Sequence, residues 1–191
     1  MHAPHDQRSA LRALTALATS QGGYFTAGQA AGFGYLAPHL SYHAARGNFE
    51  RTGHGVYRLP SVPAGPLDDL VQLWLWSRSD AGRPRAVFSH HTALSLHDLS
   101  EEIPSRIHMT VPPGFRKRVP RGCVLHVGHV APTDRQNFDA VPATTPLRTL
   151  QDLADDAGFP TGQFRDAVRS AARRGLVSAR ERTSLLARRA R

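Results

Sequence analysis

The stretch that decides the fold covers residues 22–60 and reads GGYFTAGQAAGFGYLAPHLSYHAARGNFERTGHGVYRLP. Within it, Thr26 precedes the helix-favouring run AGQAA, and Gln29 follows Thr26 by three residues. This spacing matches a capping box, in which two side chains satisfy free backbone N–H groups at a helix start. The sequence therefore predicts a helix that begins directly after Thr26.

A second helix is expected after the break Gly32-Phe33-Gly34, because glycine accepts the positive φ angles of a tight turn between helices. This helix should span residues 35–46, with Leu36 and Leu40 on an apolar stripe. Its remaining surface is mixed in character and is the candidate recognition surface. The candidate contact residues are Tyr35, His39, Ser41, Tyr42, His43 and Arg46.

A hairpin is expected next, since residues 49–51 and 56–59 are strand-like and flank the glycine-containing turn of residues 52–55. Helix, turn, helix and hairpin in this order predict a winged helix-turn-helix, with the wing at residues 51–58. In that fold the second helix enters the major groove of DNA, and residues beside it reach phosphates or the minor groove. Arg51, His54 and Arg58 are the candidate wing contacts, although an ion pair of Arg58 with Glu50 across the hairpin is an open alternative.

The charge of the chain points in the same direction. Its 191 residues include 24 basic and 15 acidic side chains, for a net charge of +9. This excess favours a polyanionic partner such as nucleic acid. A bias toward arginine over lysine, with abundant alanine and glycine, would also follow from a genome of high GC content, so charge alone does not decide the partner.

Composition excludes several other classes of protein. Hydrophobic residues make up 40% of the chain, but no apolar run approaches the roughly 18 residues of a membrane span. No signal peptide is apparent at the N-terminus, so a cytoplasmic location is the expectation. The single Cys123 excludes an internal disulfide and a cysteine-rich zinc site.

A domain boundary is predicted after the hairpin, because residues 60–66 contain three prolines and a glycine. We expect a winged helix-turn-helix domain over residues 1–60, a linker over 61–66 and an α+β domain over 67–191. In this second domain the patterns predict strands near 106–111, 124–127 and Val141. They predict helices from Pro66, over residues 90–96, from Thr145, over 161–174 and over 178–190.

Basic residues of the second domain form a separate group of candidates. They would contact phosphates or an acidic protein partner, or remain solvated, and the sequence leaves these alternatives open. The candidates are Arg116, Lys117, Arg118, Arg121, Arg169, Arg173 and Arg174.

The eleven histidines raise the question of a catalytic or metal site. His90 and His97 stand two helical turns apart, and His91 is beside the first of them, but no established metal or phosphate-binding motif is present. We therefore expect no catalytic residues, no metal and no cofactor. The ordinary alternative is that Ser89 and His90 cap a helix while His97 packs against a strand, and the role of the three histidines stays open.

Six stretches of sequence in this order resemble one known family. They are GGYFTAGQAAGFG with ERTGHGVYRLP, WLWSRSDAG, AVFSHHTALSLHDLS, RIHMTVP and VPATTPLRTLQDLA. Together they are similar to the AbiEi-type antitoxins, which are the transcriptional-regulator half of type IV toxin-antitoxin systems that act in phage defence. The resemblance implies a winged helix that binds inverted repeats in its own promoter. For the oligomeric state we expect a monomer in solution or a dimer on DNA. It also implies a C-terminal antitoxin domain and a nucleotidyltransferase-like toxin as partner.

Overall fold

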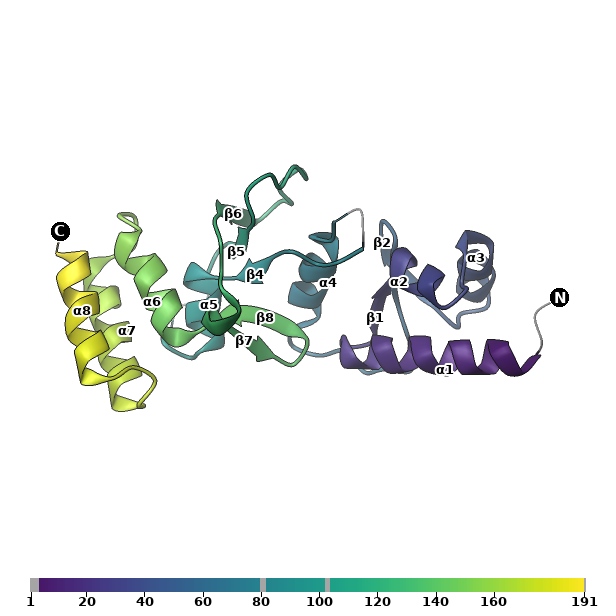
Figure 1. Ribbon diagram of the computed structural model, residues 1–191, viewed down its shortest axis with the longest axis horizontal. Helices are drawn as coiled ribbons and strands as arrows, with labels where there is room; N and C mark the ends of the chain where they lie inside the picture. The colour runs from purple at the N-terminus through teal and green to yellow at the C-terminus, as the bar shows by residue number, and fades with distance from the viewer. Residues whose placement is uncertain (1–3, 80–81, 102–103, 191) are drawn as a thin grey trace. The chain divides into compact units, whose positions relative to one another are not determined.

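The computed structural model describes residues 4–79, 82–101 and 104–190, with side chains from Arg8 onward. The chain divides into two compact units, shown along the ribbon in Figure 1. Unit 1 contains Met1–Arg85 and Asp139–Val141, and unit 2 contains Ala86–Phe138 and Pro142–Arg191. Each unit is described by itself below.

Unit 1 is a winged helix-turn-helix, as the sequence predicts. Its three short strands form an antiparallel sheet in the order β1-β3-β2, and β2 and β3 form the wing. In chain order its elements are α1 (Pro4–Ser20), β1 (Tyr24–Thr26), α2 (Ala27–Gly32), α3 (Ala37–Ala45), β2 (Glu50–Gly53), β3 (Val56–Arg58) and α4 (Asp68–Trp76).

The core of unit 1 is aromatic and joins all parts of the winged helix. Phe25 of β1 lies at its centre and is fully buried. The Phe25 ring meets Phe49 edge to face at 5.0 Å and stacks on Tyr57 at 5.7 Å between ring centroids. Leu14 of α1 and Leu40 of α3 close the same cluster. Such aromatic pairs contribute about 0.5–1.5 kcal/mol each beyond the area they bury, so they hold β1 against β3 and against the residue that precedes β2.

Unit 2 combines a five-stranded mixed sheet with helices. The strand order is β6-β5-β4-β8-β7, in which β5 runs parallel to β6 and antiparallel to β4. Its elements are β4 (Val87–Phe88), α5 (His90–Leu96), β5 (Ile107–Val111), β6 (Cys123–Val127), the 3-10 turn η1 (Pro132–Asp134), β7 (Arg135–Phe138), β8 (Val141–Thr144), α6 (Pro146–Asp155), α7 (Thr161–Arg173) and α8 (Ala179–Arg189).

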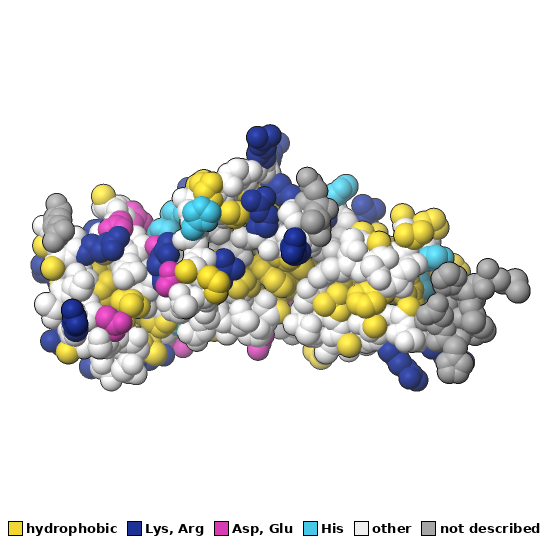
Figure 2. All heavy atoms as spheres, in the orientation of Figure 1, with side chains coloured by type: hydrophobic (Ala, Val, Ile, Leu, Met, Phe, Trp, Pro, Cys, Tyr) yellow, Lys and Arg dark blue, Asp and Glu magenta, His cyan; other side chains and the backbone are white. Residues whose placement is uncertain are grey.

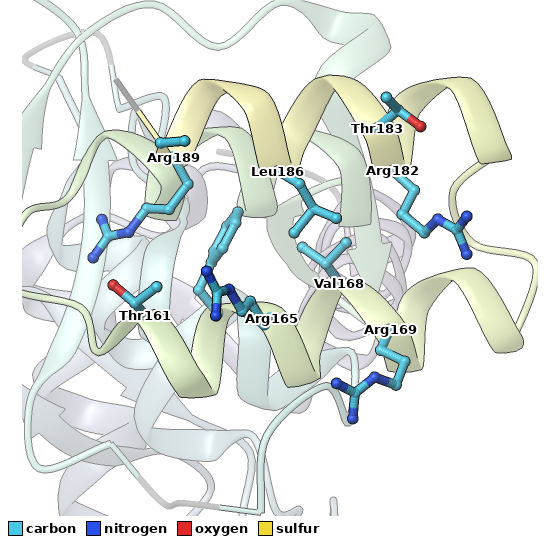
Figure 3. Close-up of a pocket in the computed structure, with 10 residues that line it drawn as sticks. Thr161, Arg165, Val168, Arg169, Arg182, Thr183, Leu186 and Arg189 are labelled. Carbon is cyan, nitrogen blue, oxygen red and sulfur yellow. The ribbon is translucent and has the colours of Figure 1, made fainter.

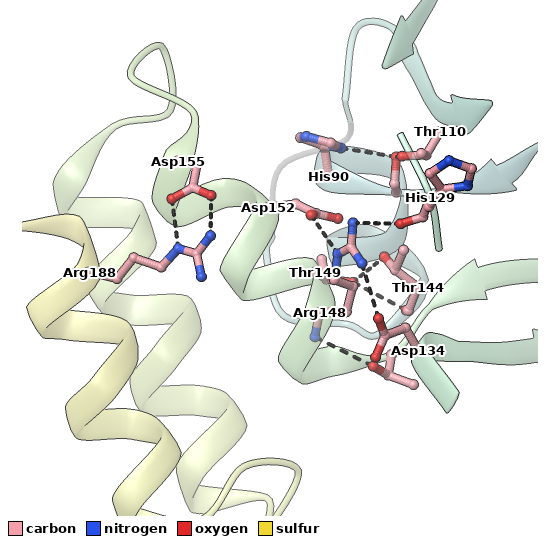
Figure 4. Close-up of polar contacts among 12 residues, drawn as sticks. His90, Thr110, His129, Asp134, Thr144, Arg148, Thr149, Asp152, Asp155 and Arg188 are labelled. Carbon is pink, nitrogen blue, oxygen red and sulfur yellow. Dashed lines mark hydrogen bonds and ion pairs between the residues drawn. The ribbon is translucent and has the colours of Figure 1, made fainter. Parts of the chain in front are cut away.

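Helices α5 to α8 share one apolar core, which includes Leu94, Leu150, Phe164 and Leu185. Polar contacts join α6 to η1, to the segment after β6 and to α8 (Figure 4). Arg148 of α6 donates to Asp152 at 2.8 Å, to Asp134 of η1 at 3.0 Å and to the carbonyl of His129 at 3.3 Å. Arg188 of α8 donates to both carboxylate oxygens of Asp155.

Most predicted elements are present, and the differences are local. The capping box of Thr26 and Gln29 is confirmed, and the predicted helix over residues 90–96 agrees with α5. The prediction that the second helix starts at residue 35 was wrong, because α3 begins at Ala37 with Leu36 as an extended N-cap. Leu36 is therefore exposed and does not share the buried stripe of Leu40.

Strands β1, β4 and β7 were not predicted, and α4 begins at Asp68 instead of Pro66. The described helices include none that is long and apolar enough to cross a lipid bilayer.

Candidate nucleic-acid interface

The exposed face of α3 presents most of the residues expected there. Leu40 anchors the helix in the core, while His39, Ser41 and Tyr42 point to solvent, and Tyr42 retains 54% of its surface. Pro38 lies in the first turn, where its missing N–H leaves no hydrogen bond unmade. The helix therefore exposes a hydroxyl, an imidazole and a phenol. It contains no acidic residue that could repel DNA phosphates or pair with a neighbouring arginine.

Arg46 is the single guanidinium at the end of this face. It is exposed, and its Cζ atom lies 4.8 Å from the centroid of the Tyr42 ring. This cation–π geometry orients the guanidinium while leaving its N–H groups available. An arginine held this way presents the paired donors that recognise guanine in the major groove.

Tyr35 and His43 are placed differently from the other candidates. The His43 ring packs against Phe49 at 4.9 Å and against Tyr35 at 5.5 Å between centroids. Burial, with smaller effects from His39 and Arg46, lowers the pKa of His43, so the ring is neutral at pH 7. Both side chains are half-buried, and their rings pack between α3 and Phe49. They remain proposed contacts, but their geometry favours a supporting role.

The wing exposes two of its three candidate residues. Arg51 is exposed on β2, and His54 is exposed at the tip, where Gly55 adopts a φ of +65°. Arg58 has only 15% of its side chain exposed, lies 3.7 Å from Glu50 and donates to the carbonyl of Val62 at 2.6 Å. The alternative role that the sequence left open for Arg58 is thus the one its geometry favours.

Two further residues of this candidate interface were not predicted from the sequence. Arg78, just after α4, donates to the carbonyl of His54 at 3.0 Å and so holds the wing tip. Asn48 is exposed beside α3, and its amide lies 3.1 Å from the Nδ1 atom of His43. The sequence does contain a signal for Asn48, because it is a polar residue that directly follows Gly47, the glycine just past the end of the second helix. The contact of Arg78 joins residues far apart in the chain and has no local signal.

Helix α4 supports this interface from within unit 1. The hydroxyl of Tyr24 donates to Asp68 at 3.0 Å, and burial together with this bond raises the pKa of Tyr24 to about 12. Val71 and Leu75 of α4 are buried. The residues expected to form a linker are also bonded, since the Gly65 N–H donates to Asp68 at 3.0 Å. The winged helix therefore packs against structure that follows the proline-rich segment.

Comparisons with known proteins identify both units. Residues 12–60 match the family model described as "Transcriptional regulator, AbiEi antitoxin", and residues 85–187 match that of the AbiEi antitoxin C-terminal domain. The chain belongs to the AbiEi antitoxin family. No curated protein matches it. A crystal structure of the RV2827C protein from Mycobacterium tuberculosis is similar at 16% identity and a TM-score of 0.44, covering 98% of this chain and 82% of that one.

In this AbiEi antitoxin the basic candidates of unit 2 fall into two groups. Arg116, Arg118 and Arg121 are exposed in the segment between β5 and β6, and Lys117 is half-buried there. Figure 2 shows Lys and Arg side chains gathered on this protruding segment. Its charge and exposure suit phosphate or an acidic protein surface equally.

The helical candidates of the antitoxin have distinct environments. Arg169 pairs with Asp166 at 3.1 Å on the surface of α7, and Arg173 is exposed. Arg174 donates to the carbonyl oxygens of His97 at 2.6 Å and Asp98 at 3.0 Å. Arg174 thus satisfies the C-terminal end of α5, which is a structural task.

The antitoxin gathers four imidazoles in unit 2. The rings of His90 and His126 stack with centroids 3.5 Å apart, and His108 approaches the Nε2 atom of His126 at 3.1 Å. His91 completes the group at 4.5 Å from His108 and lies 3.6 Å from Asp156. We call these four residues the histidine cluster.

Three rings of the histidine cluster, those of His90, His108 and His126, lie in surroundings that favour their neutral state. Burial, with repulsion from neighbouring histidines, lowers the pKa of His90 to about 3 and that of His108 to about 4. Burial also lowers the pKa of His126. Stacked rings do not converge their nitrogen atoms on one point, and among the described residues no group of three His, Cys, Asp or Glu side chains has the geometry to hold a metal ion.

His97 is separate from the cluster. It is buried at the end of α5, and its Nε2 atom lies 2.7 Å from the carbonyl of Thr144 on β8. The prediction that His97 packs against a strand is confirmed. Ser89 is the N-cap residue of α5, as expected, but its side chain makes no capping hydrogen bond. The Ser89 hydroxyl instead contacts His90 and accepts a hydrogen bond from Thr110.

Proposed function

We propose that this antitoxin represses transcription by binding duplex DNA at inverted repeats in its own promoter. The observation that carries this proposal is the exposed face of α3, on which Arg46 lies over Tyr42 in a winged helix of the AbiEi regulator family. Arg46, Tyr42, Ser41 and His39 would contact base edges. Arg51 and His54 on the wing would contact phosphate or the minor groove, and these contacts position the protein rather than select the sequence.

A gel-shift titration tests this proposal. The duplex is the region upstream of the gene, compared with a random duplex of equal length at several salt concentrations. We expect preference for the promoter and an affinity that falls with rising salt, because phosphate contacts release bound counterions. Equal affinity for both duplexes, or a flat salt response, would contradict operator binding.

Recognition of inverted repeats requires two copies of the antitoxin on one operator. We propose that the chain is monomeric in solution and dimeric on DNA, because repeat symmetry matches a two-fold arrangement of winged helices. Sedimentation of the free protein and of the complex measures both states. A half-site duplex should then bind one copy, with lower affinity than the full site.

The second candidate function is neutralisation of a toxin through protein contact, with the winged helix as a scaffold. The match of unit 2 to the AbiEi antitoxin C-terminal domain favours it. The partner we propose is a nucleotidyltransferase-like toxin encoded beside this gene. Co-expression with the neighbouring gene, followed by a pull-down, tests it. If co-expression does not relieve toxicity of the neighbouring gene product and no complex is pulled down, the protein would be a stand-alone regulator.

A further inference from the structure

A groove runs between α7 and α8 of unit 2. Its volume is about 490 Å³, within the range of about 300–1,000 Å³ that is usual for ligand sites. Figure 3 shows Val168 of α7 and Leu186 of α8 pointing toward one another between the two helices. Arg169 and Arg182 lie near one end of the groove. The groove is thus apolar along its floor and basic along its rim.

The helical repeat explains this distribution. Phe164 and Val168 are four residues apart on α7 and are buried, while Arg165 and Arg169 follow each of them by one residue and are exposed. A shift of one residue rotates a side chain by about 100° around a helix, which moves it from the floor to the rim. Leu186 of α8 keeps 39% of its surface exposed and supplies the accessible apolar atoms.

The rim arginines differ in how strongly they are engaged. Arg189 donates to the carbonyl of Asp156 at 2.6 Å and belongs to the internal structure of the unit. Arg169 pairs with Asp166, but these side chains are 67% and 71% exposed, and ion pairs so exposed to water add little to stability. Within the part of the chain that the structure describes, the guanidinium groups of Arg165 and Arg182 form no hydrogen bond or ion pair.

The surrounding charge is strongly positive. Residues 161–190 contain eight arginines and two acidic residues. Both acids are engaged locally, Asp166 with Arg169 and Glu181 with the N–H and hydroxyl of Ser178. They therefore leave the charges of Arg165 and Arg182 uncompensated.

We propose that this groove binds an acidic amphipathic helix of a partner protein. Apolar side chains of that helix would lie on Leu186, and its carboxylates would pair with Arg165 and Arg182. Interfaces between proteins have an apolar centre and a polar rim enriched in arginine, and amphipathic helices bind grooves in this manner. A nucleic acid would use the arginines alone, and a second copy of this chain would bring its own excess of positive charge. The proposal does not depend on DNA binding by unit 1.

The test is a titration of the full-length protein into a labelled peptide, followed by fluorescence anisotropy. The peptide is an amphipathic helix of glutamate and leucine, about 18 residues long so that it can form a stable helix. A peptide of identical composition with its leucines scattered around the helix is the matched control. A random DNA duplex is the third ligand.

Three variants separate the contributions of charge and apolar contact. Arg165→Glu reverses a rim charge, Leu186→Ser removes the accessible apolar group, and Arg180→Glu reverses an exposed charge of α8 that does not line the groove. We expect Arg165→Glu and Leu186→Ser each to weaken peptide binding by about tenfold or more, because the first sets like charges against one another and the second removes the accessible apolar contact. Arg180→Glu should change it by less than about threefold, because Arg180 lies outside the groove and would act on the peptide only through electrostatics that salt screens.

Several outcomes would overturn the proposal. One is equal binding of the amphipathic and the scattered peptide. Another is loss of duplex binding in Arg165→Glu with no effect of Leu186→Ser on any ligand, which would make this face a phosphate-binding surface. Melting curves of each variant guard against misfolding. If Arg165→Glu fails to fold, Arg182→Gln and Leu186→Ser provide the same comparison.

Discussion

Among single residues, Arg46 is the one for which we predict a direct role in recognising the operator sequence. We expect Arg46→Ala to weaken operator binding by about 1–3 kcal/mol and to relax the preference at one base pair, because a bidentate arginine–guanine contact is lost. Arg46→Lys should not restore that preference, since an ammonium group cannot present two parallel donors. The measurement is a gel shift against a set of singly substituted operators.

Arg180→Ala is the matched control for Arg46. It removes the same charge from an exposed position of unit 2. If Arg46→Ala and Arg180→Ala lower affinity equally for every operator, Arg46 acts only through general electrostatics, and base recognition by α3 is contradicted.

The histidine cluster predicts how stability depends on pH. The pKa values of His90 and His108 fall from about 6.5 in the unfolded chain to about 3 and about 4 in the folded one. Below pH 6.5 the unfolded chain therefore binds more protons than the folded one. The contribution of these two histidines to the free energy of unfolding is fully present above pH 6.5 and is lost as the pH falls toward their folded-state pKa values. Arg106 and the other rings oppose protonation, while Asp152 and Asp156 favour it, and the sum still lowers these pKa values.

We expect the free energy of unfolding to fall by about 2 kcal/mol between pH 7 and pH 5. This is less than the linkage relation gives for two fully buried groups, because the rings are partly exposed. Urea unfolding at each pH measures it. His126→Gln removes the ring that stacks on His90, so it should flatten this pH dependence. An unchanged pH profile in His126→Gln would show that the cluster is not its source.

At the scale of elements, Arg148 joins α6 to η1 and to the segment after β6. We expect Arg148→Met to destabilise the protein by about 2–3 kcal/mol, because the largely buried carboxylate of Asp152 loses its partner. The double variant Arg148→Met with Asp152→Leu should regain at least half of that loss, since no unpaired charge remains. Chemical denaturation measures both variants, and a double variant no better than the single one would contradict this account.

Elements with local signals could be predicted from the sequence, and those fixed by distant pairing could not. Thr26 and Gln29 lie three residues apart and define the start of α2 without help from the rest of the chain. Strand β1, by contrast, has three residues and exists because it pairs with β3, from Tyr24↔Arg58 to Thr26↔Val56. No periodicity can appear in so short a segment.

The residues of the candidate sites also differ in whether local sequence spacing could predict them. The exposed positions of α3 follow from helical spacing once Leu40 is placed in the core. The histidine cluster does not follow from spacing, because His108 and His126 become neighbours only through the parallel pairing of β5 and β6. The sequence suggested His90 and His97 as partners along one helix, whereas the fold brings His90 to His126 instead.

At the scale of the whole molecule, composition places a linker at residues 61–66, while the contacts of unit 1 continue to Arg85. Prolines limit regular structure there, but they do not prevent the segment from packing. Gly65 and Asp68 are bonded to one another, and Asp68 is bonded to Tyr24 of β1. Proline content reports local backbone freedom and carries no information about such tertiary contacts.

We therefore expect the independently folding N-terminal domain to extend to residue 85. A fragment of residues 1–85 should unfold cooperatively in urea. A fragment of residues 1–60 should be less stable by about 3 kcal/mol or more, because it loses burial of Val71 and Leu75, each contributing about 1.5–3 kcal/mol. In the full-length chain, Leu75→Ala should lower the stability of this domain by about 2–3 kcal/mol. Equal stability of the two fragments would instead place the domain boundary at residues 61–66, and α4 would then belong with the C-terminal domain.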